Sequence, residues 1–169
     1  MTAQPLSESS KAVIDGWVKK FPKDHPRAAL CGALKHVQEE NGGHLTDDLM
    51  TSVANYLGLP PIEVFEVASF YDLCEFQPIG RYKLAVCTNV SCMLCGSTEI
   101  VEHLEKRLGI KMGETTPDGL FTLRDVECLA ACINAPMLQL NDKELYEKLT
   151  IADVDALLDR LIDEAKTKE

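Results

Sequence analysis

Hydrophobic positions in the first part of the chain recur at the helical period of 3.6 residues. One stripe ends at Pro22, and a second stops at Asn41-Gly42-Gly43, which is typical of a helix C-cap. Both stripes predict amphipathic helices without a cofactor pocket. The residues expected to face the core are Ala12, Val13, Trp17, Val18 and Phe21 in the first helix and Ala29, Leu30, Ala33, Leu34 and Val37 in the second.

Two more helices are predicted before residue 71. Thr46 can cap the third, Asp47 and Asp48 favour its positive end, and Gly58 closes it. Pro61 suits the first position of the fourth. Their expected core faces are Leu49, Met50, Val53, Tyr56 and Leu57, then Ile62, Phe65, Val67 and Ala68. The four stripes together predict a small helical bundle.

The pattern changes after Gln77-Pro78-Ile79-Gly80, which we take as a domain boundary between residues 1–78 and 79–169. The later part predicts a strand, a helix, two strands and a final helix, and therefore a small α/β sandwich. The whole chain is thus expected to be α+β. The predicted elements are a strand at 82–88, a helix at 97–108, strands at 119–126 and 137–140, and a helix opened by the capping box Thr150–Asp153.

Composition indicates a folded chain, because 46% of the 169 residues are hydrophobic and only 26% are charged. The net charge of −10 argues against nucleic acid or an anionic membrane surface as a direct partner. No stretch approaches the ~20 apolar residues of a membrane span. Met1–Lys11 has no apolar core and no arginine, so neither a secretory signal nor a transit peptide is predicted there. We expect a cytosolic or already processed protein.

Seven cysteines change this picture, because their number is odd and no export signal is expected. A disulfide framework is therefore a poor explanation, and clustered cysteines in a reducing compartment more often bind metal or carry out redox chemistry. Cys31 and Cys74 fall in or beside helical stripes and are expected to be small core residues. The other five are Cys87, Cys92, Cys95, Cys128 and Cys132.

Two cysteine pairs follow two of the predicted strands. Cys87-x4-Cys92 comes after the first strand and Cys128-x3-Cys132 after the second, so both pairs lie in loops at strand ends. A 2Fe–2S cluster needs four ligands, two for each iron, and two such pairs supply them. The small residues Gly96, Ser97, Ala130 and Ala131 would let backbone approach sulfur, and water access is expected to be limited by Met93, Leu94, Leu129, Ile133 and Pro136.

Three alternatives remain open on spacing alone. Structural zinc also takes four cysteines, although the x3 spacing of the second pair is less usual for it. Cys92-Met93-Leu94-Cys95 resembles a dithiol redox motif, which leaves three cysteines unexplained. Cys87-x4-Cys92-x2-Cys95 with one distant cysteine also matches plant-type ferredoxin spacing, in which Cys95 would replace Cys128 or Cys132 as a ligand.

No site for NADH or a flavin is evident in the chain. No glycine-rich phosphate loop follows a strand, and Gly42-Gly43 is interpreted as a helix cap. The histidines His25, His36, His44 and His103 are not paired at metal-ligand spacing. No Ser/His/Asp arrangement is evident either, so no catalytic residue is predicted.

Three sequence blocks resemble the 24-kDa (E) subunit family of respiratory complex I, the NADH–quinone oxidoreductase. They are Phe65–Tyr71 (FEVASFY), Cys87–Cys92 (CTNVSC) and Asp125–Met137 (DVECLAACINAPM), and the resemblance runs from about Ala12 to the last helix. It implies a thioredoxin-like ferredoxin domain behind a helical bundle. Because the bundle carries no chemistry of its own, we expect it to be the docking surface for the flavin subunit. The resemblance also implies a 2Fe–2S cluster on Cys87, Cys92, Cys128 and Cys132, whereas Cys95 matches no ligand of the family.

The same resemblance implies a place for the chain in a larger complex. The family's flavin subunit (F, 51-kDa type) holds FMN and the NADH site, and the large iron–sulfur subunit (G, 75-kDa type) is a further expected partner. The cluster would take one electron from reduced flavin temporarily. Related domains occur in NAD-linked hydrogenases and formate dehydrogenases. In a bacterium the complex would hold this chain at the cytoplasmic face of the inner membrane, without inserting it.

Overall fold

The computed structural model describes residues 5–167. Met1–Gln4, which belong to the segment expected to carry no targeting signal, and the last two residues lie outside the described part. Within that part, no helix has both the length and the apolar character that crossing a membrane requires. The chain forms two compact units, which we call the helical unit (residues 1–78) and the sheet unit (residues 79–169).

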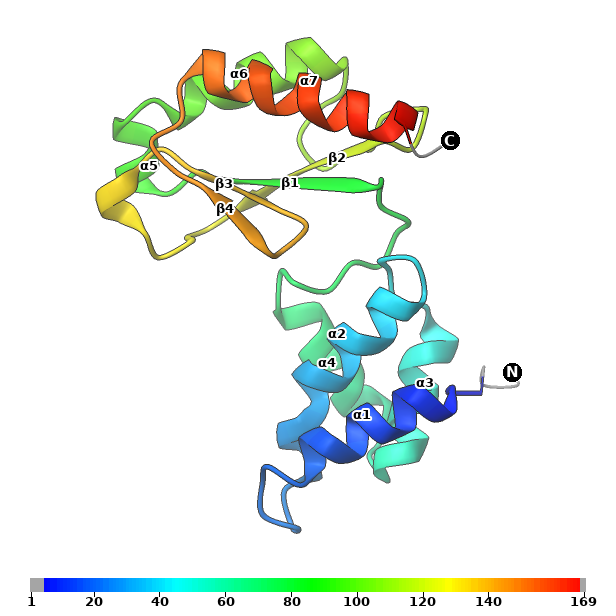
Figure 1. Cartoon of the computed structure of the whole chain (residues 1–169). Coiled ribbons are helices and arrows are strands. Elements are labelled where there is room, and N and C mark those ends of the chain that lie inside the picture. The colour runs from blue at the N-terminus through cyan, green and yellow to red at the C-terminus, as the bar shows by residue number, and fades with distance from the viewer. Residues whose placement is uncertain (1–4, 168–169) are drawn as a thin grey trace. The chain divides into compact units, whose positions relative to one another are not determined.

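In its described residues, 5–78, the helical unit contains four α-helices and a short 3₁₀ turn, drawn in blue to green in Figure 1. Local capping sets its helix ends. The Ser7 hydroxyl accepts the Ser10 N–H at 2.9 Å and opens α1, and Thr46 accepts the Leu49 N–H at 3.2 Å and opens α3. The elements are α1 (Glu8–Val18), η1 (Pro26–Ala29), α2 (Leu30–Glu40), α3 (Asp47–Leu57) and α4 (Pro61–Phe70).

An apolar cluster forms the core of the helical unit. The predicted face of α2 is confirmed, because all five of its stripe residues are buried. Gln38, also buried, ties α2 to the segment after α4, since its amide donates to the Leu73 carbonyl at 2.9 Å and accepts from the Glu75 N–H at 2.7 Å. The core includes Ile14, Leu30, Leu34, Val37, Leu45, Met50, Val53, Val64 and Ala68.

Three parts of the predicted core faces are wrong. In α1 the buried apolar residue is Ile14, whereas Ala12 and Val13 are exposed. On α3, Tyr56 is 38% exposed and its hydroxyl donates to Asp15 Oδ1 at 2.8 Å. In α4 the inward residues are Val64 and Ala68, while Ile62 and Phe65 are exposed.

The sheet unit is built on a four-stranded mixed sheet (Figure 1). The strands are β1 (Tyr82–Cys87), β2 (Phe121–Val126), β3 (Leu138–Leu140) and β4 (Glu144–Tyr146), in the order β2-β1-β3-β4. β1 and β2 run parallel with Cys87 opposite Val126, and the other pairs are antiparallel. The central place of β1 explains why all six of its residues are buried.

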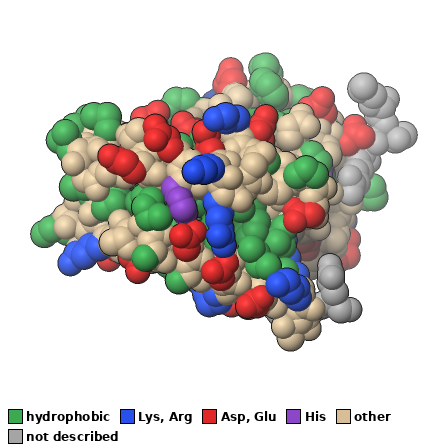
Figure 2. All heavy atoms as spheres, turned by 90° about the horizontal axis from the view of Figure 1, so that it is seen from above, with side chains coloured by type: hydrophobic (Ala, Val, Ile, Leu, Met, Phe, Trp, Pro, Cys, Tyr) green, Lys and Arg blue, Asp and Glu red, His purple; other side chains and the backbone are tan. Residues whose placement is uncertain are grey.

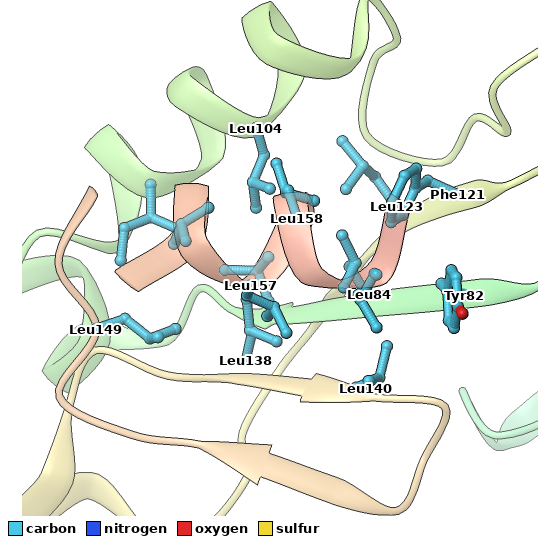
Figure 3. Close-up of a cluster of buried hydrophobic side chains, with 14 of the residues drawn as sticks. Tyr82, Leu84, Leu104, Phe121, Leu123, Leu138, Leu140, Leu149, Leu157 and Leu158 are labelled. Carbon is cyan, nitrogen blue, oxygen red and sulfur yellow. The ribbon is translucent and has the colours of Figure 1, made fainter. Parts of the chain in front are cut away.

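Two long helices, α6 (Ser97–Leu108) and α7 (Ile151–Thr167), cover one face of this sheet (Figure 1). Leucines from both layers meet in the core, with Leu84 and Leu138 on the strands below Leu104 and Leu158 on the helices (Figure 3). On the outer surface, acidic and basic side chains are mixed (Figure 2), and Arg107 joins α6 to α7 through Asp159 at 2.6 Å.

The α+β class is confirmed, and so are the main elements of the sheet unit. The predicted bounds of α6 hold, and Thr150 and Asp153 form the capping box, with the Asp153 side chain accepting the Thr150 N–H at 2.9 Å. Three short elements were not predicted from the sequence. They are α5 (Val90–Leu94), the 3₁₀ turn η2 (Cys132–Asn134) and the strand β4.

Candidate metal centre

Both cysteine pairs leave the sheet at one edge, because β1 and β2 are parallel neighbours. The Thr88 N–H donates to the Val126 carbonyl at 3.2 Å, so the pairing of the two strands continues to their last residues. On its other side, β1 is bonded through the Cys87 N–H to the Met137 carbonyl at 3.1 Å. Three segments of the chain therefore meet around Cys87.

The structure brings the first pair together in the protein interior. Cys87 ends β1, and Asn89 opens the short helix α5, which carries Cys92. Both thiols belong to residues only 1% exposed, they are joined by a hydrogen bond, and Met137 packs against them. The Cys87 thiol also lies 3.9 Å from the carbonyl oxygen of Glu127, which precedes the second pair.

Burial makes the charged form of Cys92 unfavourable. The pKa of the Cys92 thiol is raised to about 11, chiefly by this burial and then by the hydrogen bond and the charge of Cys87, with a smaller contribution from the charge of Cys132, although the Met137 backbone acts in the opposite direction. A thiolate at this position consequently needs a positive charge beside it, which iron ions would supply.

The second pair lies on the loop that follows β2. Cys128 and Cys132 are both exposed, and Ala130 between them has a positive φ of 61°. This backbone conformation turns the Ala130 N–H toward Cys128 Sγ, to which it donates at 3.3 Å. The far end of the loop is fixed, because the Asn134 carbonyl accepts the Lys148 N–H at 2.8 Å.

The donor set fits a 2Fe–2S cluster in its chemistry and its placement. Four thiols lie on the two segments that leave one sheet edge, and a backbone N–H already donates to one sulfur, as is typical of sulfur ligands in such clusters. Within residues 5–167, however, no three His, Cys, Asp or Glu side chains stand ready to hold a metal ion. The first pair would supply two ligands from the interior and the second pair two from an exposed loop, where Cys132 is near enough for its charge to affect the pKa of Cys92.

The remaining cysteines are placed differently. Cys95 is exposed at the C-cap of α5, where its N–H donates to the carbonyls of Cys92 at 3.1 Å and Ser91 at 3.2 Å. Cys31 and Cys74 lie in the helical unit, where both are half-buried and Cys74 packs against the core, in keeping with a structural role.

The expected apolar cover of the site is partly wrong. Met93, Leu94 and Ile133 are 50%, 77% and 92% exposed, so these side chains do not shield the cysteines. The predicted Leu129 does pack against the buried pair, and the rest of this wall is formed by Met137, Val126, Ala131 and Ala135. Met137 begins the strand predicted at residues 137–140, but no sequence pattern places that strand beside the first cysteine.

The chain belongs to the thioredoxin-like [2Fe–2S] ferredoxin family, whose model matches residues 14–162. The mixed sheet and the cysteines at one of its edges agree with this assignment. The relatives of the chain agree with the resemblance of the three sequence blocks. It is 42% identical over 151 residues to the E subunit of NADH-quinone oxidoreductase from Rickettsia prowazekii, covering 89% of this chain and 85% of the relative. It is 50% identical over 133 residues to the corresponding E 2 subunit from Rhizobium meliloti, covering 79% and 78%.

Two longer proteins also contain a region similar to this chain. The mitochondrial NADH dehydrogenase [ubiquinone] flavoprotein 2 of Dictyostelium discoideum is 45% identical over 163 residues, which are 96% of this chain and 66% of the relative. A solved NAD⁺-reducing [NiFe]-hydrogenase in the air-oxidised state aligns with a TM-score of 0.65 at 23% identity. That alignment covers 78% of this chain but only 23% of the hydrogenase chain, so it supports the fold alone.

Proposed function

We propose that this chain is the electron-transfer subunit of an NADH–quinone oxidoreductase and holds one 2Fe–2S cluster on Cys87, Cys92, Cys128 and Cys132. The observation that carries the proposal is the meeting of both cysteine pairs at one edge of the sheet, with the first pair buried against Met137. The relatives named as E subunits of that enzyme, similar over most of their own length, supply the parent complex.

The bound cluster would supply one-electron redox chemistry, and the chain's own residues set its conditions. The four thiolates hold the iron, and the Ala130 N–H stabilises negative charge on the Cys128 sulfur. The Met137 side chain keeps water from one side of the buried pair. The chain itself performs no bond chemistry under this proposal.

The electron would be exchanged with FMN on an adjacent NADH-oxidising subunit of the F type, and a G-type iron–sulfur subunit would be a further partner. The exposed side chains of Val90, Met93, Leu94 and Ile133 support this, because they leave the cysteine edge open to an apolar partner surface. In a bacterial cell the complex would place the chain at the cytoplasmic face of the inner membrane.

Co-purification with a co-expressed NADH-oxidising flavoprotein tests the proposal. We expect the tagged full chain to recover the flavoprotein, and NADH to reduce the flavin in the recovered complex. A free-standing ferredoxin would instead be recovered only as a soluble homodimer with diffusible partners, and that result would contradict the subunit assignment. A chain without visible absorbance that reduces disulfides would contradict the cluster itself.

A further inference from the structure

Helix α4 and the segment after it expose a cluster of large apolar side chains. Ile62 and Phe65 lie one helical turn apart and are 61% and 47% exposed, and Phe70 is 76% exposed. The Phe65 and Phe76 rings have their centroids 6.1 Å apart, so the surface continues beyond the helix. Several large apolar side chains gathered in one place typically mark an interaction site.

A groove of about 270 Å³ lies between the first turns of α3 and α4, beside these side chains. Its lining is apolar except for one hydroxyl and one carboxylate, and consists of Asp47, Met50, Thr51, Pro61, Ile62 and Phe65. Such a groove suits a long side chain with an apolar stem and a cationic end, because the stem packs on the walls while the cation meets the carboxylate. Lysine and arginine have that form.

The charge of the surrounding sequence favours the same occupant. Residues 36–80, which contain α3 and α4, include no lysine or arginine, whereas they contain the acidic residues Glu39, Glu40, Asp47, Asp48, Glu63, Glu66, Asp72 and Glu75. Glu63 and Glu66 are bridged by Arg27 at 3.1 and 3.0 Å, but Asp47 and Asp48 at the groove end of α3 are exposed. A partner surface with basic residues around an apolar contact complements this face.

We infer that the α3–α4 groove is a docking site for a lysine or arginine side chain of the flavin-bearing subunit, on a surface of that subunit where basic residues surround an apolar contact. The inference rests on the proposed function, because the partner it names is the flavin-bearing subunit. Beyond the proposed function, it specifies which face of the helical unit contacts the partner and which type of partner side chain enters the groove.

The test compares two neighbouring aspartates. Asp47 lines the groove and Asp48 does not, yet both carry one charge in the first turn of α3, so the helix loses the same favourable interaction in either variant. With the co-expressed flavoprotein as the probe, Asp47→Asn should weaken binding by roughly tenfold or more, as expected for a charged hydrogen bond. Asp48→Asn should change binding by less than about threefold.

A second variant separates the groove from charge alone. Ile62→Ser should also weaken binding by roughly tenfold, whereas Val13→Ser, which removes an exposed apolar side chain from α1, should not. All four variants should keep the electron paramagnetic resonance (EPR) signal of the reduced 2Fe–2S cluster, which shows that the sheet unit is intact.

Three results would overturn the inference. If Asp47→Asn and Ile62→Ser bind the flavoprotein as tightly as the parent does, the groove is not the docking site, although the proposed function stands. If the parent chain forms a dimer that both variants dissociate, a second copy occupies the groove. If the parent binds no flavoprotein at all, the proposed function fails and this inference fails with it.

Discussion

The buried cysteines owe their positions to backbone hydrogen bonds on both sides of one residue. The backbone of Cys87 is held by β2 on one side and by the Met137 carbonyl on the other, so its position does not depend on a bound metal. Cys128 and Cys132 lie on a loop beyond the paired strands and are exposed. This difference makes the first pair the buried half of the proposed site and the second pair its exposed half.

The start of α1 is held by hydrogen bonds to one carboxylate, that of Glu40, and a substitution of Glu40 tests their contribution to stability. Its carboxylate accepts from Ser9 at 2.6 Å, from Ser7 at 3.0 Å and from Ser10, and these bonds, chiefly those of Ser10 and Ser9, lower its pKa from 4.5 to about 2. Glu40→Gln should therefore lower the thermal midpoint of the helical unit at pH 7. Combining it with Ser10→Ala should lower the midpoint little further, because the two side chains form one interaction that the first substitution has already removed.

The pH dependence follows from the direction of that pKa shift. A carboxyl whose pKa is lower in the folded state stabilises the fold above its ordinary pKa and loses that contribution as the pH falls. The difference in thermal midpoint between the parent and Glu40→Gln should thus be largest above about pH 4.5 and should decrease as the pH approaches 2. A difference that stays constant from pH 7 to pH 2.5 would show that charge on Glu40 is not the cause.

At the scale of elements, replacing a helical glycine by alanine should have opposite effects on the free energy of unfolding at two positions. A Cβ on Gly32 of α2 would overlap the ring of Trp17 on α1, whereas a Cβ on Gly16 of α1 would meet no atom of the described residues within 4 Å. Gly32→Ala should lower the free energy of unfolding by about 1–3 kcal/mol, and Gly16→Ala should raise it by about 0.5–1 kcal/mol.

Urea unfolding measures both variants in the unit concerned. Trp17 is the only tryptophan, so its fluorescence reports on the helical unit. Circular dichroism of the helices is a second measure of unfolding, in case a substitution changes the Trp17 fluorescence of the folded state. Equal stability of the two variants would mean that α1 and α2 do not pack through Gly32.

Element boundaries were predictable where capping residues mark them. Gly96 and Gly109 flank α6 with positive φ angles, and the capping box marks the start of α7, so both starts agree with the sequence. The buried face of α4 was not predictable, since most of its positions are apolar and no period selects Val64 over Phe65. The strand β4 has only three residues and depends on pairing with β3, which no local pattern reveals.

The candidate site shows the same division. The spacing of the two pairs predicted that each follows the end of a strand, and the parallel pairing of β1 and β2, which the sequence pattern does not reveal, brings them to a common edge. Which pair is buried was not predictable, since it depends on β3 pairing beside β1 and bringing Met137 to the first pair. The exposure of Met93, Leu94 and Ile133 was likewise not predictable, because it depends on tertiary structure. An apolar side chain in the sequence can either cover the cysteines or face a partner protein.

At the scale of the whole molecule, net charge predicts how the chain meets its partner. The chain carries a net charge of −10, and residues 88–99 and 125–136 at the cysteine edge contain no lysine or arginine. Association with a basic flavoprotein surface should therefore slow as salt is raised, while dissociation changes little. Stopped-flow mixing over a range of ionic strengths measures both rates. An association rate that rises with salt would mean that like charges meet at the interface.

The measurement that tests the central claim most directly is EPR of the reduced protein in five cysteine-to-serine variants. Cys87→Ser, Cys92→Ser, Cys128→Ser and Cys132→Ser should each abolish or strongly alter the 2Fe–2S signal. Cys95→Ser should leave the signal nearly unchanged and serves as the matched control, since Cys95 is an exposed cysteine of the same edge. Loss of the signal in Cys95→Ser with its retention in Cys132→Ser would contradict the proposed ligand set and favour the plant-type one.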